Sequence, residues 1–177
     1  MPDHYAFSVE TRRGDLHLIW RSGEGDDRDT FAVDDRRRLL AFHAVDTLRH
    51  HCERSGRHLV AGGEGSLDLE AVRDDLRAPG PGILPTGRLL EAWNFFEDLA
   101  RSVDTPTALP VQGPVHDLAY ERFFEDGAAW SDAESAAARG LLGAGLDLWD
   151  EAVRDALVPD ADLPARSTRG GRTVPPR

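Results

Sequence analysis

The stretch TGRLLEAWNFFEDLARSV, residues 86–103, determines the fold of this chain more than any other. Its large apolar residues recur every three or four positions, the spacing that places side chains on one face of an α-helix. We therefore expect a helix over residues 86–103 that forms the centre of the hydrophobic core. The residues of this face are Leu89, Leu90, Trp93, Phe96, Leu99 and Val103.

Two more helices are expected after this one. Residues 115–126 form the first of them, behind a proline-rich connection. Ser131 and Glu134 have the spacing of a capping box, which predicts the start of the last helix. Leu142 and Trp149 lie on its apolar face, and three glycines inside it favour a kink or a break. These glycines are Gly140, Gly143 and Gly145.

The N-terminal part of the chain has a pattern typical of β-strands. Tyr5, Phe7 and Val9 alternate with polar residues, and a second alternating run covers residues 16–20 after a glycine-containing turn. Such alternation gives one buried and one wet face, so we expect a β-hairpin that is covered on one side only. Residues 30–33 would make it a three-stranded meander.

The middle of the chain predicts further helices. Residues 34–54 are expected to form one long helix, capped by the aspartate at its start. Residues 58–61 follow as a short strand, and a glycine-rich turn leads into a brief helix over residues 67–77. The segment 78–82, with two prolines and two glycines, is a break but not a domain boundary.

These elements predict an α+β fold. An N-terminal antiparallel β-hairpin or three-stranded meander packs against a mainly helical body of four to five helices. Residues 1–159 are expected to form a single domain, because each half alone would bury a marginal core. Residues 160–177 have no apolar period and are expected to be a disordered basic tail.

The charge of the chain is strongly unbalanced. It has no lysine, and 21 arginines stand against 32 Asp and Glu, for a formal net charge of −11. An acidic body repels phosphate backbones and anionic lipid and attracts basic protein surfaces. The missing lysine excludes Schiff-base chemistry and a phosphate-loop lysine. We therefore expect a basic protein partner, and neither nucleic acid nor membrane.

The sequence predicts a cytoplasmic protein. Cys52 is the single cysteine, which excludes an internal disulfide and favours a reducing compartment. The N-terminal residues lack the pattern of a signal peptide, and no apolar run is long enough to cross a bilayer.

Recognisable catalytic motifs are missing from the sequence, including a Walker loop, a nucleophile elbow and an HExxH pair. The densest group of metal-ligand types is His50, His51, Cys52, Glu53 and His58, but Cys52 falls on an apolar stripe. We interpret this group as a solvated helix end, and we predict no catalytic residue, no metal site and no cofactor.

We interpret the chain as an acidic cytosolic protein-binding module, such as an immunity protein or antitoxin that masks a basic partner. One alternative is a structural or regulatory subunit of an assembly, which would leave aromatic residues such as Phe95 or Phe124 exposed. The other is a small enzyme with a histidine or carboxylate site. The residues expected to contact the partner are Glu24, Asp26, Asp27, Asp29, Glu121, Glu125, Asp147, Asp150 and Glu151.

Overall fold

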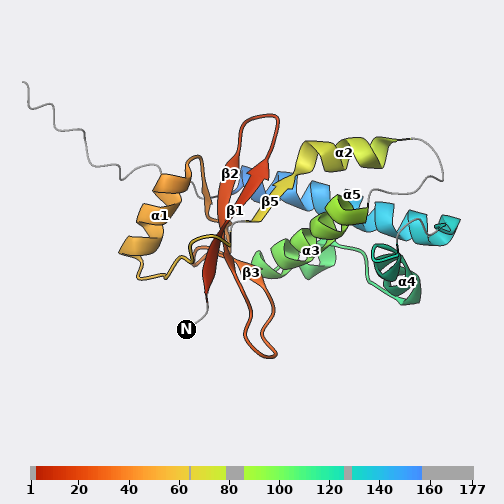
Figure 1. Ribbon diagram of the computed structural model, residues 1–177, viewed down its shortest axis with the longest axis horizontal. Helices are drawn as coiled ribbons and strands as arrows, with labels where there is room; N and C mark the ends of the chain where they lie inside the picture. Colours follow the sequence, from red (N-terminus) through yellow and green to blue (C-terminus); the bar gives the residue numbers. More distant parts are fainter. Residues whose placement is uncertain (1–2, 64, 79–85, 126–128, 157–177) are drawn as a thin grey trace, which may run out of the picture.

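The computed structural model describes residues 3–63, 65–78, 86–125 and 129–156. These residues form an α+β fold, in which a mixed five-stranded sheet is combined with five α-helices. Figure 1 shows how the elements are arranged. In chain order the elements are β1 (His4–Glu10), β2 (Leu16–Arg21), β3 (Thr30–Phe31), β4 (Ala41–Phe42), α1 (Val45–Arg54), β5 (Gly65–Asp68), α2 (Leu69–Arg77), α3 (Thr86–Ser102), the 3-10 helix η1 (Pro106–Ala108), α4 (Pro114–Arg122) and α5 (Asp132–Arg154).

The predicted N-terminal hairpin is confirmed and forms the middle of the sheet. β1 and β2 pair antiparallel, with His4 opposite Arg21 at one end and Val9 opposite Leu16 at the other. The strand order is β3-β2-β1-β5, and β4 also pairs with β2. β5 pairs parallel with β1, which the chain achieves by crossing over through α1 before it returns to the sheet. The sheet is therefore mixed, and among its described strands the parallel pair is β1 with β5, at one edge.

The larger core lies between the sheet and the helices α2, α3 and α5 (Figure 1). α3 lies at the centre of this core, as predicted, and Leu89, Trp93, Phe96 and Leu99 of its apolar face are each at most 1% exposed. Phe95 is also buried, because its ring packs between the sheet and α5. The expectation that it could be left exposed is therefore wrong.

The prediction that the sheet is covered on one side only is wrong. α1 lies on the face opposite to α3 (Figure 1), where a second apolar cluster is buried. This face is apolar because Ala6 and Ile19 occupy the positions of β1 and β2 that point away from the larger core. The residues buried there are Ala6, Ile19, Leu40, Phe42, Leu48 and Cys52.

The predicted long helix over residues 34–54 is wrong in its first half. Asp34 does not cap a helix, because its carboxylate accepts hydrogen bonds from the backbone N–H groups of Arg36 and Arg38. These bonds close a tight turn in which Arg37 has a φ of 62°, and Val33 pairs with Leu39 across it. The helix begins only at Val45, after β4.

The next two predictions also need correction. Residues 58–61 supply only an isolated parallel bridge between Leu59 and His4, and not a regular strand. Residues 65–68 form β5, where the end of a glycine-rich turn and a helix start at residue 67 were expected, and α2 begins at Leu69. Asp68 caps α2 through a 2.9 Å hydrogen bond from the Ala71 N–H.

Both of the last two helices are present as predicted, but α4 is shorter than expected and α5 has no break. α4 ends at Arg122, and Asp126, the expected last residue, lies outside the described residues. α5 begins with the predicted capping box of Ser131 and Glu134 and runs unbroken to Arg154, so its glycines do not break it. The predicted basic tail, residues 160–177, lies outside the described residues. None of the described helices is long and apolar enough to cross a membrane.

Candidate functional site

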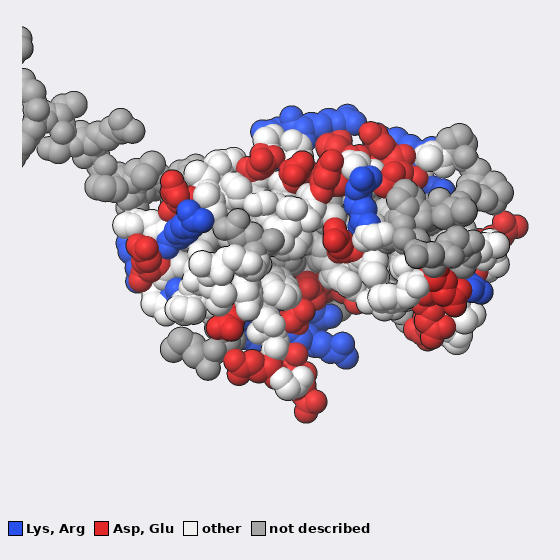
Figure 2. All heavy atoms as spheres, viewed as in Figure 1, with Lys and Arg blue, Asp and Glu red and all other residues white. Residues whose placement is uncertain are grey.

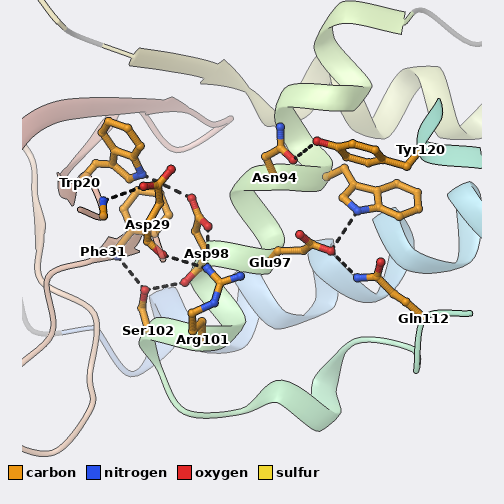
Figure 3. Close-up of polar contacts among 12 residues, drawn as sticks. Trp20, Asp29, Phe31, Asn94, Glu97, Asp98, Arg101, Ser102, Gln112 and Tyr120 are labelled. Carbon is orange, nitrogen blue, oxygen red and sulfur yellow. Dashed lines mark hydrogen bonds and ion pairs between the residues drawn. The ribbon is translucent and has the colours of Figure 1, made fainter. Parts of the chain in front are cut away.

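A cleft of about 620 Å³ lies between α3, the helical face of the sheet and the β2–β3 loop, residues 22–29. We call it the α3 cleft, and Figure 3 shows its polar contacts. Its walls come from β1, β2, β3, β5, the β2–β3 loop, α3 and α4, so it exists only in the folded domain. The residues that line it are Phe7, Trp20, Asp27, Arg28, Asp29, Phe31, Gly65, Ser66, Glu91, Asn94, Phe95, Glu97, Asp98, Arg101 and Tyr120.

Three phenylalanines form an aromatic cluster on the sheet side of the cleft. The ring centroids of Phe31 and Phe95 are 5.1 Å apart, and Phe7 lies within 5.7 Å of both. Gly65 of β5 lies directly against the Phe7 ring, since a Cβ atom there would come within 2.6 Å of it. A side chain at this position would therefore displace the ring.

Asp98 lies beside this aromatic cluster and holds two parts of the cleft together. Its Oδ2 accepts a 3.4 Å hydrogen bond from Trp20 Nε1, and its Oδ1 accepts a 2.8 Å bond from Arg101 Nη1 (Figure 3). Burial raises the pKa of this carboxyl to about 6, although both hydrogen bonds favour its charged form. The group is thus mostly ionised at neutral pH and titrates in mildly acidic solution.

The β2–β3 loop is fixed to the C-terminal end of α3. Arg101 Nη1 also donates a 2.9 Å hydrogen bond to the backbone oxygen of Asp29. Ser102 Oγ accepts a 2.7 Å bond from the backbone N–H of Phe31 and donates to the Asp98 carbonyl (Figure 3). The Asp29 carboxylate accepts from the Gly23 N–H, which shapes the loop. The acidic loop is therefore held at a defined place over the cleft.

Glu97 stands on the exposed side of α3, near the connection to α4. Its Oε1 accepts hydrogen bonds from Trp93 Nε1, at 3.1 Å, and from Gln112 Nε2 (Figure 3). Among the described residues, no hydrogen bond or ion pair engages its Oε2. One turn earlier, Asn94 accepts a 3.0 Å bond from the Tyr120 hydroxyl of α4. α3 therefore presents an oriented carboxylate with one oxygen available to a ligand.

The α3 cleft is acidic. Its lining includes five carboxylates and two guanidinium groups. Two of the carboxylates are paired within the protein, Asp98 with Arg101 and Asp27 with Arg21. Glu91 and Glu97 take part in no ion pair among the described residues. The cleft is also lined by the partly exposed rings of Phe7, Trp20 and Tyr120. It can therefore bind a guanidinium or ammonium group both by charge and by contact with a ring.

The structure divides the residues predicted to contact a partner into three groups. Asp27 and Asp29 line the α3 cleft, and Glu24 and Asp26 are exposed on the same loop. Glu121 lies on α4 and Glu125 just after it. The third group lies on α5, where Asp147, Asp150 and Glu151 are exposed and Asp150 forms a 2.6 Å ion pair with Arg73 of α2.

These groups do not merge into one acidic surface on the face seen in Figure 2. Red carboxylates gather over α2, over the loop between β2 and β3, and over α4, with blue arginines beside them and uncharged surface between. Ion pairs such as Arg77 with Asp74 and Arg88 with Asp75 join these neighbours. Net charge alone therefore does not single out a binding face.

Sequence reasoning missed the residues that α3 contributes to the cleft. The apolar face of the segment 86–103 predicts the core, whereas the cleft residues lie on the opposite face of the helix. That face shows a signal, because its polar residues recur at intervals of three or four positions over three turns. The residues concerned are Glu91, Asn94, Glu97, Asp98 and Arg101.

The histidine group lies on the other side of the sheet, at α1. Cys52 is 1% exposed in the second core, where burial raises the pKa of its thiol. His51 packs against the Phe42 ring, and its Nε2 lies 3.2 Å from Arg57 Nη1. The pKa of His51 is lowered mainly by burial, and to a smaller extent by the nearby Arg57 cation. Within the described ranges, no three His, Cys, Asp or Glu side chains are arranged to hold a metal ion.

No protein-family model and no curated protein sequence matches this chain. Among solved structures, the chain is similar to the crystal structure of the SatS C-terminal domain in complex with bromine. The sequence identity is 14%, the TM-score is 0.52, and the match covers 88% of this chain and 93% of that chain. At this identity the likeness extends to the fold and no further.

Proposed function

We propose that this protein is a binding module that holds a cationic segment of a partner protein in the α3 cleft. The observation that carries the proposal is the lining of the cleft, where five carboxylates stand beside the partly exposed rings of Phe7, Trp20 and Tyr120. The loop that supplies Asp27 and Asp29 is fixed to α3 by Arg101 and Ser102. The acidic wall is therefore ordered before a partner arrives, which lowers the entropic cost of binding.

The chemistry of the cleft supports a polypeptide ligand. Carboxylates repel the phosphates of nucleic acids and anionic lipids, while they attract arginine and lysine. Arginine fits best, because its planar group pairs with a carboxylate and stacks on an aromatic ring at the same time. Glu97, with its free Oε2, is the residue we assign to the first such contact.

A finer version of this proposal is that the partner is a basic toxin, which would make the protein an immunity protein or an antitoxin. The small size and the acidic charge of this chain support that role. Charge complementarity with a basic toxin would give fast association and would exclude wrong partners. This version rests on sequence reasoning and stays a prediction.

One observation favours a second candidate, a regulatory or structural subunit of an assembly. Among the described residues, the four exposed large apolar side chains all lie between positions 111 and 124. Phe124, at 66% exposed, shows the surplus apolar surface expected for that role. The residues are Val111, Val115, Leu118 and Phe124.

Capture of partners from the native lysate at low salt tests the proposal. The bait is the full chain in three forms: unchanged, Glu91→Gln with Glu97→Gln, and Asp147→Asn with Glu151→Gln. Both double variants remove two surface carboxylates, and the new amide at position 97 keeps an oxygen for Trp93 and Gln112. The last pair is the matched control on α5, away from the cleft.

We expect one partner that the unchanged and the α5 baits capture and the α3 double variant loses. About 0.5 M NaCl should release it, since the Debye length then falls to a few ångströms. Equal capture by all three baits would reject the α3 cleft as the binding site. Loss with the α5 variant alone would move the site to α5.

A further inference from the structure

The α3 cleft continues along the same helix into a second hollow with different chemistry. This hollow has a volume of about 720 Å³ and shares Arg28, Glu97 and Arg101 with the cleft. The other residues of the second hollow are mainly apolar and come from the end of α3 and the η1–α4 connection. The apolar residues are Ala100, Pro106, Leu109, Pro110 and Val111.

Val111 is the most exposed large apolar side chain of the described residues, at 95%. Its position is defined, because the neighbouring Gln112 donates a hydrogen bond to Glu97 of α3 (Figure 3). Leu109, two residues earlier, is buried against the core and anchors the same segment. An apolar side chain is therefore displayed beside the carboxylate that joins the two hollows.

The combined length of the two hollows along α3 determines how many residues of a peptide they can hold. The lining of the two hollows extends along α3 from Glu91 to Asp104 just beyond its end. Thirteen residues at 1.5 Å each span about 20 Å along a helix axis. An extended peptide rises about 3.3 Å per residue, so about six residues cover that distance.

We propose that the two hollows bind one extended partner segment of about six residues, half basic and half apolar. Its basic side chains contact Glu91 and Glu97, and its apolar side chains contact Val111 and its neighbours. Charge complementarity with the cleft and its continuity with the apolar hollow argue for this occupant. The inference rests on the proposed function, because it assumes that the cleft takes the cationic half.

Three acetylated and amidated peptides test the inference by calorimetric titration of the full chain at low salt. The peptide RRRLLL has the block order that the surface fits. The peptide RRRSSS keeps only its basic half, and RLRLRL has the composition of the first peptide in alternating order. We expect RRRLLL to bind about tenfold more tightly than either of the others, which corresponds to burial of roughly one leucine side chain.

Two protein variants locate the apolar contact. Val111→Ser should remove the tenfold advantage of RRRLLL and leave the affinity for RRRSSS unchanged. Leu118→Ser is the matched control, because this exposed residue of α4 does not line either hollow, and it should change neither affinity. Both positions are exposed, so neither substitution disturbs the core.

The outcomes separate the two proposals. Suppose that RRRSSS binds and that Glu97→Gln lowers its affinity. If RRRLLL then binds no more tightly than RRRSSS, or if Val111→Ser does not lower the affinity for RRRLLL, the further inference is wrong and the proposed function stands. Equal binding of RLRLRL and RRRLLL also overturns the division of the surface. If none of the peptides binds, or Glu97→Gln changes nothing, the proposed function itself is wrong.

Discussion

The ring of Phe96 in α3 lies so close to Gly145 in α5 that a Cβ atom at that glycine would overlap it. At this contact, α5 therefore presents only the backbone of Gly145, and α3 packs the aromatic ring of Phe96 against it. The cleft is built on the opposite side of α3 from this contact. The placement of its carboxylates thus depends on a tight helix pair behind them.

Gly145→Ala should destabilise the fold by about 2 kcal/mol or more, because the new methyl group overlaps the Phe96 ring and forces the helices apart. Gly143→Ala is the matched control in the same helix, where a Cβ atom meets nothing within 4 Å. It should stabilise the fold by about 0.5–1 kcal/mol through helix propensity. Urea unfolding of both variants measures this, and equal effects would contradict the packing described.

Ser102→Ala should destabilise the fold by about 1–3 kcal/mol, because it leaves the buried N–H of Phe31 without its acceptor. The same loss should loosen the β2–β3 loop over the cleft. Hydrogen exchange of the Phe31 amide checks the local effect. Ser66→Ala, at an exposed position, is the control for serine removal, and the account fails if both variants are equally stable.

Asp98→Asn should change the pH dependence of stability. The pKa of Asp98 is raised from 3.8 to about 6 by burial, so between these values the folded state keeps a proton that the unfolded state has released. Stability from this group is present below about pH 4 and is lost as the pH rises through about 6. The asparagine variant escapes this loss.

Relative to the unchanged protein, Asp98→Asn should therefore gain about 2 kcal/mol between pH 4 and pH 7, when solvent screening at a partly exposed site is allowed for. Denaturant unfolding of both proteins across this range measures the difference. A difference that does not vary with pH would show that Asp98 titrates normally.

Local sequence patterns were sufficient to predict the two long helices. The apolar spacing of residues 86–102 and the capping box at Ser131 each indicate a helix and no other structure. Such patterns failed at residues 34–44, where the spacing of Leu39, Leu40 and Phe42 fits a helix as well as a turn between strands. The hydrogen bonds that the Asp34 carboxylate accepts from the backbone stabilise the turn instead of a helix. β5 was missed because four residues carry little pattern, and its partner β1 lies far away in sequence.

The site was predictable only in part. The acids of the β2–β3 loop were identified from their density, and Asp27 and Asp29 do line the cleft. The acids of α5 were chosen by the same density, yet Asp150 pairs with Arg73 on another part of the surface. Density of charge cannot show which acids a fold brings together, because that depends on long-range packing.

The four tryptophans give the most direct test of the central claim, that the α3 cleft binds a cationic segment. Trp20 lines the cleft and Trp93 donates to Glu97, while Trp130 packs on Phe123 and Trp149 is buried behind α3. Their indole N–H signals can be followed by NMR during titration with the peptide RRRSSS. We predict saturable shifts of the Trp20 and Trp93 signals that Glu97→Gln weakens, with the other two unchanged. Shifts confined to Trp130 or Trp149, or no shifts at all, would contradict the claim.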